Sequence, residues 1–134
     1  MKILGENSFY ECNALEEIEN IDGIETIGML AFYNTAISGK LYFPNIKTLE
    51  YGALAFMDNI TELEFGPNLE TVKDDAFSND KNLKKIIFNS MDTSFEDYKE
   101  VEDEDKALNW EVVAPKGSTA EKWAKDNGLK LTAK

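Results

Sequence analysis

The sequence predicts an α/β repeat fold, a solenoid in which short parallel strands stack one per repeat and a helix-containing unit caps the C-terminal end. One observation is an apolar pattern that recurs every 22 to 23 residues, from starts at Leu4, Ile27, Leu49 and Val72. Another is that residues 110–134 replace this pattern with helix start and stop signals. A unit of this size cannot bury its own apolar face, so neighbouring units must stack around a shared core.

Each predicted repeat opens with a turn segment. Five positions after each start, a bulky residue follows a small one, at Phe9, Phe32, Leu54 and Phe77. We expect this segment to form a turn followed by a short helical or irregular stretch on the wall opposite the strands. Three of the repeats start directly after a threonine, namely Thr26, Thr48 and Thr71. We expect these threonines to lie in register on neighbouring turns, where they would stabilise the structure by cross-strand hydrogen bonds rather than bind a partner.

The second half of each repeat has strand periodicity. In Leu41-Tyr42-Phe43 and Leu63-Glu64-Phe65 the outer residues are apolar, so they point inward while the middle residue points outward. Proline and asparagine then end the strand, as in Pro44-Asn45. The sequence therefore predicts parallel strands about 4.8 Å apart. It also predicts that two columns of phenylalanine form the core, namely Phe9, Phe32 and Phe77 with Phe43, Phe65 and Phe88.

These patterns divide the chain into three parts. Residues 3–88 contain four repeats, residues 89–109 form an acidic insertion or a degenerate repeat, and residues 110–134 form the cap. In the cap, Ser118 and Glu121 have the spacing of a capping box at a helix start. Gly128 suits the left-handed position after the helix, and Trp123 on the helix is expected to cover the last repeat.

The repeat resembles the BspA-like leucine-rich repeat, whose pattern is I-G-x-x-A-F-x-x-C … L-x-x-I-x-I-P. The matching residues are Ile27-Gly28-Met29-Leu30-Ala31-Phe32 and Leu41-Tyr42-Phe43-Pro44. Cys12 stands where the pattern has its cysteine, and residues 117–131 are similar to the terminal unit that closes such arrays. The resemblance covers residues 3–88 and 110–131. It implies a secreted or cell-surface bacterial protein that binds host or matrix proteins, without chemistry in the repeat.

The composition excludes several classes of function. The chain has 26 acidic residues, 14 cations that are all lysine, no histidine and a net charge of −12. An acidic chain without arginine repels nucleic acid, and without histidine the common catalytic pairs and His metal sites are absent. No segment has the length and apolarity for membrane insertion. We expect no enzyme activity, cofactor or metal, and we expect Cys12 to be a small buried side chain rather than a nucleophile.

The outward strand positions are the candidate partner-binding face. They form two columns, which are Glu17, Lys40, Glu62 and Lys85 in one and Glu19, Tyr42, Glu64 and Ile87 in the other. Because charges alternate in the first column, one interpretation is an ion ladder that keeps the surface soluble. The other is a binding face with Tyr42 and Ile87 as its apolar contacts. A binding face would make the chain a protein-binding or adhesion module, whereas an ion ladder would suit a structural spacer. An accessory domain of a hydrolase is a third possible function.

Two further features leave alternatives open. Seven acidic residues lie between Asp92 and Lys106, and we expect a solvated insertion, with a calcium site or a contact to a basic partner as alternatives. At Ile3 and Leu4 the array starts without a polar cap. We therefore expect either that this chain is the C-terminal part of a longer protein or that the uncapped edge self-associates.

Overall fold

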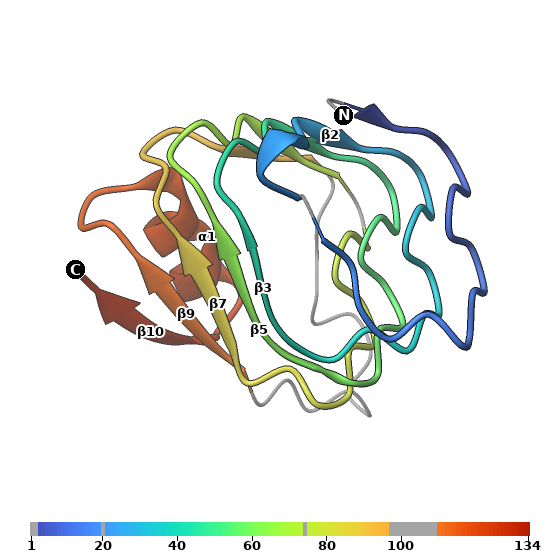
Figure 1. Cartoon of the computed structure of the whole chain (residues 1–134). Coiled ribbons are helices and arrows are strands. Elements are labelled where there is room, and N and C mark those ends of the chain that lie inside the picture. The colour runs from blue at the N-terminus through green and yellow to red at the C-terminus, as the bar shows by residue number, and fades with distance from the viewer. Residues whose placement is uncertain (1–2, 20, 74, 97–109) are drawn as a thin grey trace.

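The computed structural model describes residues 3–19, 21–73, 75–96 and 110–134, and it shows a solenoid of parallel strands with the two termini at opposite ends (Figure 1). Sheet A has the order β1-β2-β4-β6-β8. Its two-residue strands are β1 (Ile3–Leu4), β2 (Thr26–Ile27), β4 (Thr48–Leu49), β6 (Thr71–Val72) and β8 (Ser94–Phe95). Sheet B has the order β10-β9-β7-β5-β3. Its strands are β3 (Gly39–Phe43), β5 (Ile60–Phe65), β7 (Lys85–Phe88), β9 (Glu111–Ala114) and β10 (Lys130–Ala133).

The predicted solenoid of stacked parallel strands is confirmed, and each turn adds a second strand that the periodicity did not reveal. Sheet A pairs Thr26 with Thr48 and Thr48 with Thr71, so the three threonines are in register as expected. These strands are only two residues long, which is too short for an alternating pattern to be recognised in a sequence. Ser94 pairs with Thr71 in the same way, so the repeat spacing continues to β8.

The segments after β1, β2, β4 and β6 form a stack of hydrogen-bonded turns, which we call the turn wall (residues 5–13, 28–35, 50–58 and 75–80). The N–H of Phe32 donates to Ala53 O of the next turn at 3.1 Å, and the N–H of Leu54 donates to Ala76 O at 2.7 Å. Between them, the N–H of Ala53 bonds within its own turn to Glu50 O at 3.1 Å. Of the two expected forms, these described segments take the irregular one and contain no helix.

Two positions in each turn-wall segment adopt a left-handed backbone. The first is occupied by Asn7, Leu30, Gly52 and Asp75, with φ between 55° and 60°, and the second by Glu11, Asn34, Phe56 and Asn79, with φ between 54° and 61°. Glycine, asparagine and aspartate tolerate this conformation, whereas other residues lose about 1–2 kcal/mol each. The stacking geometry therefore imposes the same backbone on every turn, including on residues that disfavour it.

The core is a column of aliphatic and phenyl side chains between the walls. Five of the six predicted phenylalanines are fully buried, whereas Phe9 is only partly buried. Cys12 is exposed, so the prediction that it is buried is wrong. Its equivalents Thr35 and Met57 are 4% and 0% exposed, because a turn covers each of them on either side. Phe9 and Cys12 belong to the first described turn, and among the described residues a turn packs on one side of them.

The first turn also differs from the expected strand pattern. The strand expected around Ile18 is absent, and the 3₁₀-helix η1 (Ile21–Gly23) contacts β3 instead. Glu16, Glu17 and Glu19 crowd three like charges into this segment, and the aromatic that anchors the later strands is missing from it. Glu17 and Glu19 are therefore exposed residues outside sheet B.

The C-terminal helix α1 (Thr119–Asp126) closes the solenoid as predicted. Ser118 Oγ accepts from the N–H of Glu121 at 3.1 Å, and Glu121 Oε1 accepts from the N–H of Gly117 at 3.2 Å, so the start of the helix is capped from both directions. Trp123 stacks on Phe95 of the last turn, with ring centroids 4.5 Å apart and planes 4° apart. Gly128 has the expected positive φ, 66°.

Residues 110–134 also supply β9 and β10, which continue sheet B beyond β7. Most of the acidic segment, residues 97–109, lies outside the described residues. In the part of the chain that is described, no helix is long and apolar enough to cross a bilayer.

Candidate functional site

Sheet B brings six of the eight predicted face residues together. Lys40, Glu62 and Lys85 are directly paired across β3, β5 and β7, and Tyr42, Glu64 and Ile87 form the adjacent column. Pairing in register places the members of each column next to one another on the outer surface. Glu17 and Glu19 do not join them, because their segment forms no strand.

The same two columns extend onto strands that the repeat pattern did not reach. Lys85 pairs with Glu111 and Glu111 pairs with Lys130, so the charges alternate along the whole sheet. Glu111 follows Lys85 by 26 positions instead of 22 or 23, so this strand does not fit the spacing of the repeat. Glu111-Val112-Val113-Ala114 repeats the order of Lys85-Ile86-Ile87-Phe88, a charged residue followed by three apolar ones, and this likeness with its two β-branched valines was the signal that could have identified it.

A charged network occupies one half of this face. Lys40 Nζ lies 2.9 Å from Glu62 Oε2 and 2.9 Å from Glu64 Oε1. The amide of Asn89 donates to Glu64 Oε2 at 2.9 Å and to Phe65 O at 2.9 Å. Lys134 Nζ donates in turn to Asn89 Oδ1. Both carboxylate oxygens of Glu64 therefore have donors.

The network sets the charge states of its members. Hydrogen bonds to Glu62 and then to Glu64 raise the pKa of Lys40 to about 12. For Glu64, partial burial favours the neutral form, but the hydrogen bonds from Lys40 and Asn89 outweigh it and lower the pKa below 4.5. Both residues are therefore charged at neutral pH, and this half of the face has its own counter-ions.

The network predicts a pH-dependent contribution to stability. Because folding lowers the pKa of Glu64, its ionised form stabilises the fold above pH 4.5, and this contribution is lost as the pH falls through the lowered pKa. We expect Glu64→Gln to lower the free energy of unfolding by about 0.5 kcal/mol at neutral pH, since the pair is partly exposed. The difference from the wild type should shrink as the solution is acidified.

Urea denaturation of both proteins across the acidic range measures this difference. Glu19→Gln is the matched control because Glu19 is exposed outside sheet B. A Glu64→Gln difference that stays constant with pH would contradict the assigned network.

Beside the network, the face carries exposed apolar surface. Tyr42 is 42% exposed, and Ile87, which is half-buried, lies in the same column on the other side of Glu64. Among the described residues, no group of three or more acidic or cysteine side chains is arranged to hold a metal ion. A sheet with an aromatic residue beside fixed charges can contact another macromolecule with little rearrangement, because the charged side chains are already held in place.

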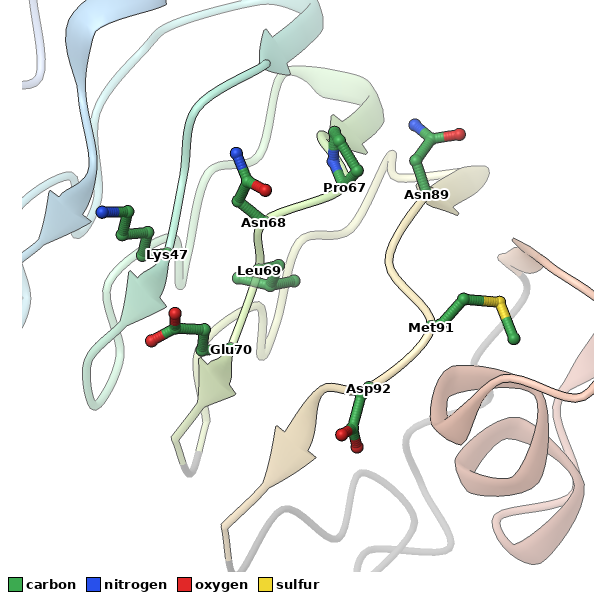
Figure 2. A pocket seen from close by; sticks show the side chains of 8 residues that line it. All are labelled: Lys47, Pro67, Asn68, Leu69, Glu70, Asn89, Met91 and Asp92. Carbon is green, nitrogen blue, oxygen red and sulfur yellow. The ribbon is translucent and has the colours of Figure 1, made fainter.

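An open groove of about 570 Å³ lies on the wall that leads from sheet B to sheet A. Figure 2 shows its lining, with Lys47, Asn68 and Glu70 on the neighbouring segments before sheet A and the Met91 side chain directed toward α1. The Met91 side chain is 54% exposed and therefore available for contact. The charge of Lys47 is already partnered, because its Nζ lies 3.6 Å from Glu25 Oε1. Sequence reasoning missed this groove, because its residues belong to the irregular connections between strands.

The comparison with known families agrees with this geometry. The model described as BspA type Leucine rich repeat region (6 copies) matches residues 1–99. No curated protein and no solved structure matches the chain. The match covers most of the chain and the turns that carry sheets A and B as far as β8. With its stacked parallel strands and repeated left-handed turns, this chain belongs to the BspA-type leucine-rich-repeat family.

Proposed function

We propose that this repeat module is a non-enzymatic protein-binding unit of a secreted or cell-surface bacterial protein, and that its partner is a host or matrix protein. The outward face of sheet B is the proposed contact surface. The observation that carries the proposal is Tyr42, an exposed aromatic residue on a rigid sheet and next to a fixed network of charges. Tyrosine is enriched among residues that dominate binding energy, and charged residues commonly surround such contacts.

The decisive variant replaces Tyr42 and Ile87 with serine. Both side chains point outward, so we expect the fold to persist and the affinity for a captured matrix protein to fall at least about tenfold. The measurement is binding of purified matrix proteins to the immobilised chain, with a thermal melt of each variant. Met91→Ser is the matched control, because Met91 is more exposed than Tyr42 but lies in the groove outside this face. Unchanged affinity in the double variant would refute the assignment of the face.

A structural spacer is the second candidate function. The observation that favours it is that Lys40 and Glu64 form an ion pair and that Asn89 donates to the second oxygen of Glu64. The charged part of the face therefore offers few free polar groups to a partner. A spacer would hold other domains apart and bind nothing. Flanking repeats and an anchoring domain in the complete gene, together with no matrix protein captured by the wild-type chain, would favour the spacer.

A further inference from the structure

The turn wall carries a stripe of aromatic side chains that is separate from sheet B. The rings of Tyr10 and Tyr33 stack with centroids 5.1 Å apart, and Tyr33 contacts Phe56 of the following turn at 4.9 Å. Tyr10 is 41% exposed and Phe56 is 36% exposed. Tyr51 lies on the same wall and is 45% exposed. Four aromatic side chains therefore emerge from three successive turns.

A pocket of about 130 Å³ opens at the end of this stripe. Three aromatic side chains line it, Tyr33, Tyr51 and Phe56, and the next turn adds polar groups from Asp75, Ser78 and Asn79. One water needs roughly 10–15 Å³ of such space, whereas pockets for small-molecule ligands measure about 300–1,000 Å³. The pocket therefore suits the head group of a single side chain.

Two residues that line the pocket adopt a backbone conformation that lowers the stability of the fold. Leu30 and Phe56 both line it, and both adopt the left-handed conformation, with φ of 56°. At the equivalent positions other turns use Asn7, Gly52 and Asp75, or Asn34 and Asn79, which tolerate this backbone, and only the first turn has another disfavoured residue, Glu11. Two unfavourable apolar residues thus occur at the same place. Local backbone strain of this kind concentrates at functional sites.

The charge around the pocket is negative. The four turn-wall segments contain no lysine, and Lys73, two positions before the fourth, has its Nζ 3.2 Å from Glu50 Oε2. Ser78 Oγ donates to Asp75 Oδ1 at 2.8 Å, and within the described residues the second oxygen of Asp75 has no partner. A cation that entered the pocket would meet aromatic rings and one carboxylate with a free oxygen.

We propose that this pocket binds an arginine side chain on a basic segment of a partner protein. Arginine combines the two features that the lining offers, because its planar guanidinium packs against aromatic rings and donates to a carboxylate at the same time. The pocket lies on a different wall from the outward face of sheet B. It is therefore a second contact surface, and its failure would leave the proposal for sheet B unaffected.

The probe is the capped tripeptide acetyl-Gly-Arg-Gly-amide, titrated into the isotope-labelled chain while amide NMR signals are followed. We expect the Ala55 and Asn79 signals to shift, with a Kd on the order of 1 mM because one side chain makes the contact. The peptide with citrulline in place of arginine has almost the same shape but no charge. It should cause no comparable shift, and equal shifts from both peptides would overturn the proposal.

The variant Phe56→Asn separates binding from folding. Asparagine suits the left-handed backbone at this position, so we expect the melting temperature to be unchanged or higher, while the peptide-induced shifts fall about tenfold. Asp75→Asn should weaken the same shifts, and Tyr42→Ser on sheet B should leave them unchanged. Wild-type shifts in Phe56→Asn would overturn the proposal. A change in the amide signals of the pocket residues when the protein concentration is raised without peptide would also overturn the proposal. In that case a second copy of the chain would be the occupant.

Discussion

Gly66→Ala is expected to lower the free energy of unfolding by about 3 kcal/mol, the upper end of what overpacking usually costs. A Cβ atom at this position would lie 1.9 Å from Pro44 O and 2.6 Å from Pro44 C, both of which are backbone atoms of the preceding turn. The N–H of Gly66 also donates to Phe43 O at 3.0 Å, which fixes the two turns against each other. The added methyl group can be accommodated only if these turns move apart.

Such a movement would disturb the centre of the core. Phe43 and Phe65 are fully buried and stack with ring centroids 6.2 Å apart, and each directly precedes one of the clashing residues. Urea denaturation measures the effect. Gly5→Ala is the matched control, because its Cβ would meet only Ser8 Oγ at 3.6 Å, an ordinary contact distance. Equal stabilities of the two variants would show that the turns are not packed as described.

Trp123→Ala should be comparably severe, with a loss of about 3–5 kcal/mol. Trp123 is only 7% exposed and contacts aromatic rings of three successive parts of the chain, with centroids at 4.5 Å for Phe95, 6.1 Å for Phe88 and 6.2 Å for Trp110. Removing the indole would leave a cavity at the junction between the cap and the last turn. Because repeat arrays depend on nearest-neighbour contacts, the damage should begin at that end.

Chemical denaturation gives the total loss, and hydrogen exchange locates it. We expect faster exchange first in β9 and β7, while β3 keeps its protection longest. Lys122→Ala on the same helix is the control, because its side chain is 78% exposed and its ion pair with Asp126 contributes little. A variant at Trp123 that melts like this control would show that the helix does not seal the core.

The repeat spacing and the apolar columns were enough to predict the solenoid, the strands β3, β5 and β7 of its sheet B, and its cap. Leu41, Leu63 and Ile86 recur at nearly constant intervals, and a constant interval is what in-register stacking requires. The capping box at Ser118 was recognisable because it depends on residues three positions apart. Such local or strictly periodic signals can be read from a chain without knowing what packs against it.

Exposure was harder to predict, because it depends on which neighbours are present. Cys12 occupies the same column as Met57, yet one side chain is exposed and the other is fully buried. The sequence marks both as members of the core column, but within the described residues a turn packs on both sides of Met57 and on one side of Cys12. The strand expected around Ile18 fails for a different reason, because Glu16, Glu17 and Glu19 crowd like charges there and the aromatic of the later strands is missing.

Of the two candidate surfaces, one could be predicted from the sequence and the other could not. The columns of Lys40 and Tyr42 were predicted from strand periodicity, which decides which side chains face outward. The pocket beside Phe56 had no signal of this kind, because it combines three turns whose left-handed residues follow no alternating pattern. The sequence by itself therefore determined the repeat, its register and its cap, since these follow from interval and composition. Only the tertiary structure decided which side chains each turn leaves uncovered, because burial is a property of neighbouring turns together.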